Sequence, residues 1–129
     1  MATFMHPYVP QTYALLRMVT GFLFFWHGAQ KLFSIPMPPP MQLPSFVIAI
    51  AGPIELVGGF LVMIGLFTGW AAFLCSGLMA FAYWMVHGTH ALLPIQNMGE
   101  LAVLFCFVFL YISAQGSGIW SVDAIRKAA

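Results

Sequence analysis

The sequence predicts an all-α integral membrane protein, a four-helix transmembrane bundle that forms one domain over residues 1–129. Of the 129 residues, 62% are hydrophobic and only 5% are charged, whereas charged residues make up about a quarter of soluble domains. The apolar residues fall into four stretches, separated by short segments rich in proline, glycine or polar residues. As a helix, a stretch of about 20 residues covers the roughly 30 Å hydrocarbon core of a bilayer.

The first predicted span, residues 13–34, carries charged groups and glycines on one helix face. Steps of four, three, four and three residues separate Arg17, Gly21, Phe24, Gly28 and Lys31. This spacing keeps side chains on one face, and His27 borders that face. Arg17 and Lys31 could simply extend from the helix ends to the lipid headgroups. The glycines favour a packed polar site at Lys31 instead, because small residues let a second helix approach closely.

The second predicted span, residues 45–66, follows a connector, residues 35–44, in which five of ten residues are proline. Within this span Gly52-Pro53 lies just before Glu55. Proline removes one intrahelical hydrogen bond, so we expect a kinked backbone near Glu55. Because Gly52 and Gly59 share a face with Glu55, this helix should pack its glycines against those of the first span.

The third and fourth predicted spans are residues 69–90 and 98–115. The third ends in aromatic and histidine residues, and we interpret Trp84 and His90 as anchors at the membrane interface. His87 fits either an anchor or a polar site. Glu100 begins the fourth span, where a carboxylate can also complement the positive end of a helix dipole.

The charge pattern predicts the orientation of the chain. An even number of spans places both termini on one side of the membrane, and Arg126-Lys127 is the exposed basic pair, so the positive-inside rule places both termini in the cytoplasm. On this topology five ionisable residues lie in the outer half of the bilayer: His27, Lys31, Glu55, His87 and Glu100. We expect them to form a polar membrane site in which Lys31 pairs with Glu55 or Glu100, because each unpaired charge is costly there.

Three other kinds of site are not indicated by the sequence. The histidines and glutamates lack the His-x3-His or Glu-x2-His spacing of di-iron bundles, so we predict no metal. A net charge of +1 without a basic run gives no footprint for nucleic acid. Cys75 and Cys106 form no CxxC motif, and we interpret both as packing residues.

The charged residues and glycines resemble a known pattern in their order and spacing. The residues concerned are Arg17, Gly21, His27-Gly28, Lys31, Glu55, Gly58-Gly59, Gly65-Leu66-Phe67-Thr68, Glu100, Gly116-Ser117-Gly118, Ser121 and Asp123. This set resembles the DoxX family of small four-helix bacterial membrane proteins, which implies a place in the bacterial inner membrane. The resemblance also implies links to quinone-dependent thiosulfate oxidation and to oxidative-stress complexes.

The sequence is compatible with three functions. An accessory or assembly subunit of a membrane redox system needs only internal polar pairs, small-residue faces and an interface for a protein partner or a second copy. A quinone-interacting oxidoreductase component needs the five ionisable residues to open onto an aromatic-lined pocket, with quinone as the cofactor. A transporter of a small solute or proton would use Glu55 beside the Gly52-Pro53 break.

Overall fold

The computed structural model describes residues 3–129, and the regular structure within this range is entirely helical. The longer helical segments are α1 (Val9–Phe33), the continuous run of α2 (Ser45–Pro53), η2 (Ile54–Gly58) and α3 (Gly59–Ile64), α4 (Thr68–Ala82) continued by η3 (Tyr83–His87), and α6 (Glu100–Gln115). The short helices are η1 (His6–Tyr8), α5 (Pro94–Asn97) and α7 (Val122–Ala128). The all-α prediction is therefore confirmed.

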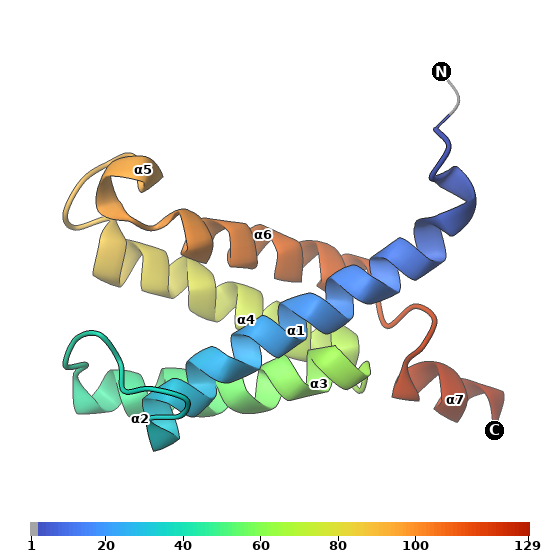
Figure 1. The fold of residues 1–129 in the computed structure, drawn as a ribbon, viewed down its shortest axis with the longest axis horizontal. Coiled ribbons are helices and arrows are strands. Elements are labelled where there is room, and N and C mark those ends of the chain that lie inside the picture. The colour runs from blue at the N-terminus through green and yellow to red at the C-terminus, as the bar shows by residue number, and fades with distance from the viewer. Residues whose placement is uncertain (1–2) are drawn as a thin grey trace.

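The longer helices pack in two extended pairs (Figure 1). α1 lies along the run from Ser45 to Ile64, and α4 lies along α6. α3 and η2 also contact α4, which joins the two pairs into one body. α7 stands beside the end of this body where α3 ends, and α5 forms a small cap at the other end (Figure 1).

The helix boundaries differ from the predicted spans at several ends: the second span ends at Ile64 instead of residue 66, and the third ends at His87 instead of residue 90. α1 begins at Val9 instead of residue 13, because Pro10 occupies its first turn, where a missing N–H costs no hydrogen bond. The fourth span was expected from residue 98, but Met98 adopts a left-handed conformation with φ of 57° and separates α5 from α6. α6 therefore starts at Glu100.

In the part of the chain that the structure describes, two helical segments are long and apolar enough to cross a membrane: Ser45–Ile64 and Thr68–His87, each of 20 residues. The apolar helix Glu100–Gln115 is shorter. α1 has 25 residues but is more polar, since it contains Arg17, Gln30 and Lys31. Length and composition alone thus identify two of the four predicted spans as able to cross a membrane.

Glycines bring the backbone of α1 against the run from Ser45 to Ile64. A Cβ atom added to Gly21 would lie 2.5 Å from the Met63 backbone nitrogen, and one added to Gly59 would lie 2.6 Å from the Phe25 nitrogen. A Cβ on Gly28 would overlap the Leu56 backbone. Gly52, the other glycine expected at this contact, lies against the side chain of Leu32. The helices can approach this closely only because these positions lack side chains.

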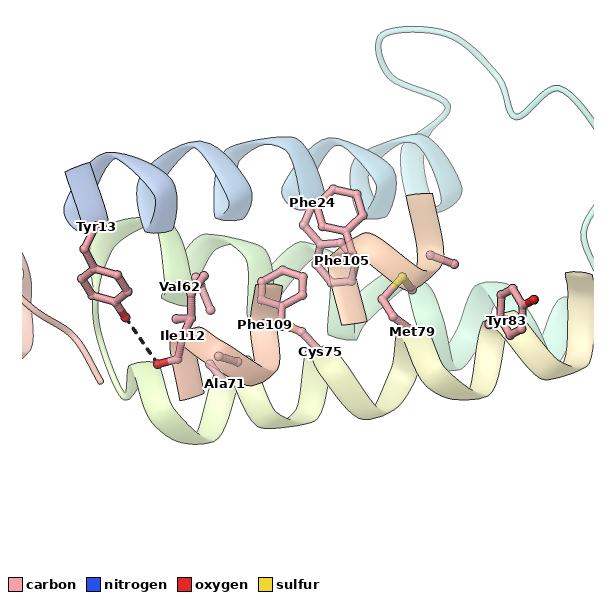
Figure 2. Packing of buried hydrophobic residues seen from close by; sticks show 12 residues of the cluster. Tyr13, Phe24, Val62, Ala71, Cys75, Met79, Tyr83, Phe105, Phe109 and Ile112 are labelled. Atoms are coloured by element: carbon pink, nitrogen blue, oxygen red, sulfur yellow. Dashed lines mark hydrogen bonds between the residues drawn. The ribbon is translucent and has the colours of Figure 1, made fainter. Parts of the chain in front are cut away.

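Aromatic side chains fill the space between α1 and α6 (Figure 2). The ring of Phe24 lies 4.7 Å from that of Phe109 and 5.3 Å from that of Phe105, centroid to centroid. Tilted and edge-on contacts of this kind add to the energy of packing. At one end of the cluster, the Tyr13 hydroxyl donates to the Ile112 and Gly116 carbonyls, which ties α1 to the end of α6.

The close packing at Gly28 predicts a position-specific cost of added volume. Gly28→Ala should lower the stability of the folded protein by about 1–3 kcal/mol, as overpacking does, because the new methyl group meets the Leu56 backbone. Gly77→Ala is the matched control, since nothing lies within 4 Å of the added Cβ. Thermal unfolding in detergent measures both variants, and equal melting temperatures would contradict the packing.

Candidate functional site

The buried ion pair between Lys31 and Glu55 is the centre of the candidate site. Lys31 lies in the last turn of α1, and its Nζ is 2.6 Å from Glu55 Oε2. The side chain of Lys31 is 16% exposed and that of Glu55 only 4%. The pairing expected from the sequence is thus present, with Glu55 and not Glu100 as the partner of Lys31.

Glu55 lies in a π-helical turn, η2, which follows Pro53 directly. Pro53 lacks an N–H and cannot make the usual bond to the carbonyl four residues earlier. The helix continues after it with one wider turn over Ile54–Gly58, so the backbone at Glu55 is irregular; the kink expected from Gly52-Pro53 stays a prediction. Wider turns of this kind often occur at functional positions. The close contact of Gly28 with Leu56 brings this turn to the end of α1, within reach of Lys31.

His27 lines a groove between α1 and α6, one turn before Lys31. The groove has a volume of about 310 Å³ and is lined by Leu23, Trp26, His27, Gln30, Pro36, Met37, Leu101 and Phe105. The imidazole meets the Phe105 ring edge-on, with 5.9 Å between centroids. This surface is apolar apart from His27 and Gln30, so it suits a lipophilic molecule that carries a small polar head.

His87 and Glu100 take part in other contacts. His87 Nδ1 lies 2.9 Å from the Asn97 carbonyl, and the Asn97 side chain donates to the Tyr83 hydroxyl and the Ala91 carbonyl. These bonds hold the connection between η3 and α6. Glu100 is exposed at the start of α6, among Ile95, Met98, Leu101 and Leu104.

The five predicted site residues therefore do not form one contact cluster. Depth along the helices could be estimated from the sequence, but the direction in which each helix faces depends on packing. The structure joins Lys31 to Glu55 and places His27 in the neighbouring groove, whereas the contacts of His87 and Glu100 are with other residues. Among residues 3–129, no three histidine, cysteine or acidic side chains gather as metal ligands.

Arg17 anchors a second polar cluster at the opposite end of α1. Its guanidinium is fully buried and donates to four backbone carbonyls: Val62 at 2.8 Å, Met63 at 2.7 Å, Ile119 at 3.4 Å and Trp120 at 2.7 Å. The alternative in which Arg17 extends to the headgroups is wrong. The last carbonyls of a helix lack intrahelical partners and carry partial negative charge, and those of α3 draw the guanidinium inward.

Asp123 completes this second cluster. Its carboxylate accepts bonds from the Phe67 and Thr68 backbone N–H groups at 3.1 and 3.2 Å and from the Thr68 hydroxyl at 3.3 Å, which caps the start of α4. Burial works to raise the pKa of Asp123, but these hydrogen bonds and nearby Arg126 outweigh it and hold the pKa below its ordinary value. No structural role was predicted for Asp123 from the sequence. The sequence feature that could have indicated such a role is the occurrence of Gly65-Leu66-Phe67-Thr68 together with Ser121 and Asp123 much later in the chain.

The buried ion pair predicts that removing one of its charges lowers stability more than removing both. Lys31→Met should destabilise the protein by about 3–5 kcal/mol, because it leaves Glu55 buried without its cation. The double variant Lys31→Met/Glu55→Leu should recover most of this loss. Thermal unfolding in detergent measures both.

Arg126→Met is the control for this experiment, since the Arg126 side chain is 56% exposed and lies 4.0 Å from Asp123. Its cost should be about 0–1 kcal/mol. If Lys31→Met and Arg126→Met cost the same, the Lys31 charge is solvated and the buried pair is absent.

The lowered pKa of Asp123 predicts a dependence of stability on pH. A carboxyl group whose pKa is lowered by folding stabilises the protein above its unfolded pKa, ordinarily 3.8. That contribution disappears as the pH falls through the lower folded pKa. The difference in melting temperature between wild type and Asp123→Asn should therefore be constant above the unfolded value and shrink below it. A difference that stays the same across this range would contradict the proposed cap.

Comparison with known proteins places these features in a family. The DoxX family model matches residues 12–88. An uncharacterized protein of Haemophilus influenzae is 38% identical over 128 residues, covering 90% of this chain and 91% of its own. A Bacillus subtilis protein described as "Putative oxidoreductase CatD" is 43% identical over 58 residues, or 42% of this chain and 43% of its own. No solved structure matches the chain. Because the family model covers more than half of the chain, including Arg17, Lys31 and Glu55, the protein belongs to the DoxX family of membrane proteins.

Proposed function

We propose that this protein is an accessory or assembly subunit of a redox system in the bacterial inner membrane, where it forms a four-helix bundle with both termini in the cytoplasm. Large apolar side chains on the outer surfaces of α1 and α6 support spans at these two helices as well as at the two apolar ones. Examples on α1 are Val19 and Phe22, and on α6 Leu104 and Phe107, each at least 48% exposed. Side chains of this kind are stable in contact with lipid.

The observation that supports the accessory role is that the charged side chains inside the bundle bind groups of the bundle itself. Lys31 and Glu55 form an ion pair between two helices, and Arg17 donates hydrogen bonds to four backbone carbonyls. These groups hold the helices together, as a subunit that supports a complex requires. The redox assignment draws on the partial similarity to the Bacillus subtilis protein, whose description is that of an oxidoreductase.

Direct interaction with a quinone is a second candidate, which the groove at His27 favours. A quinone is a lipophilic ring with two carbonyl oxygens that accept hydrogen bonds. In the groove, the imidazole of His27 and the amide of Gln30 could donate to such oxygens, while Leu23, Trp26 and Phe105 would contact the ring. The ion pair lies one turn further along α1. Because Glu55 compensates the charge of Lys31, the pair would add little positive electrostatic potential at the groove.

Gentle extraction of the protein from its native membrane tests these alternatives. Quinone, haem and protein that co-purify with the wild type should be identified together with the oligomeric state. A stoichiometric protein partner without quinone supports the accessory role. Recovery of a homo-oligomer with neither partner nor quinone contradicts it and favours transport through the region of Glu55.

A groove variant separates specific quinone binding from quinone dissolved in carried-over lipid. Leu23→Trp should fill the groove and reduce bound quinone at least tenfold if quinone occupies it. Leu104→Trp adds the same side chain to an exposed position on α6 and should leave quinone unchanged. Equal retention by both variants would remove the quinone candidate.

A further inference from the structure

We propose that α7 and the adjacent Trp120 form an interfacial anchor that binds the anionic lipid surface at the end of the bundle where α3 ends. The inference rests on the membrane-embedded bundle of the proposed function, and it concerns a surface that the proposed redox role does not use. Three features of this segment support it: its two-sided helix, its position beside α3, and the charge that remains exposed on it.

α7 is amphipathic. The helical period places Ala124, Ile125 and Ala128 on one side and Asp123, Arg126 and Lys127 on the other. The polar side faces the start of α4, because Asp123 bonds there and Arg126 lies 5.1 Å above the Phe67 ring. Within residues 3–129 the apolar side is mostly uncovered, since Ile125 is 71% exposed and Ala128 is also exposed.

The apolar side of α7 borders a groove that continues the outer surface of the bundle. The groove has a volume of about 520 Å³ and is lined by Ile64, Trp120, Ser121, Val122, Ala124, Ile125 and Ala128. Ile64 is the last residue of a helix that is apolar enough to cross a membrane. The groove therefore opens at the level where that helix leaves the hydrocarbon, and lipid is the occupant continuous with this surface. Trp120 is 58% exposed there, and tryptophan is the residue typical of the interface.

The charge exposed on this segment is positive. The chain has four basic residues, counting lysine and arginine together. Two of them, Arg17 and Lys31, bind partners inside the bundle. Arg126 and Lys127 are exposed at the end of α7. The one acidic residue of α7, Asp123, directs its carboxylate to the Phe67 and Thr68 N–H groups. The lipids that match an apolar face flanked by two cations are those with anionic headgroups.

Hydrogen exchange of the full-length protein in nanodiscs tests the anchor. One set of discs contains phosphatidylcholine alone, and the other contains phosphatidylcholine mixed with phosphatidylglycerol. The amides of residues 122–128 should exchange more slowly in the anionic discs, by about fivefold for each cation near the surface. Equal rates in the two lipids would overturn the proposal.

Two variants separate charge from packing. R126Q/K127Q should lose the difference between the two lipids, whereas the charge-conserving R126K/K127R should keep it. Ile125→Asn should speed exchange in both lipids and leave their ratio unchanged. If the lipid difference persists in R126Q/K127Q, the cations do not contribute and the proposal fails.

A separate readout tests the embedded bundle on which the inference rests. Phe60 is 45% exposed on α3, and Phe60→Cys should resist a membrane-impermeant maleimide in the same discs if the bundle is embedded. Rapid labelling at this position would contradict the proposed bundle. Protection at this position, combined with lipid-independent exchange in α7, would contradict the anchor alone.

Discussion

The close backbone contact between α1 and the run from Ser45 to Ile64 is the constraint on which the rest of the structure depends. Gly21 and Gly28 on one side and Gly59 on the other remove the side chains that would hold the helices apart. This spacing brings the ammonium group of Lys31 to the π-helical turn that carries Glu55. Wider helix separation would leave both charges in a medium of low polarity, where neither is stable alone.

The polar groups of the bundle divide between its two ends, and they act differently there. At one end two side chains of opposite charge meet, so the contact depends on both residues being present. At the other end Arg17 binds only backbone carbonyls, and Asp123 binds two backbone N–H groups and one hydroxyl. These contacts join the end of α3, the start of α4 and the segment between α6 and α7.

Much of the fold could be predicted from the sequence, because composition and helical spacing report directly on helices in an apolar setting. The glycines and charges on one face of α1 indicated its packing side, and Pro53 indicated the irregular turn at Glu55. The facing direction of α4 and α6 could not be read in the same way, since their apolar residues surround the helix nearly evenly. For that reason the positions of His87 and Glu100 relative to Lys31 were beyond sequence reasoning. The hydrogen-bond partners of Arg17 could not be predicted either, because they are backbone carbonyl groups, which every residue has.

The carbonyl contacts of Arg17 link the beginning of the chain to its end. Arg17 lies in the first long helix, whereas the carbonyls of Ile119 and Trp120 follow it by 102 and 103 residues. As the chain is synthesised, the guanidinium is in place long before two of its four acceptors exist. Until then the guanidinium needs other hydrogen-bond acceptors in place of these two, because a charge buried without partners is costly. The full set of Arg17 contacts therefore cannot form until the residues around position 120 have been made.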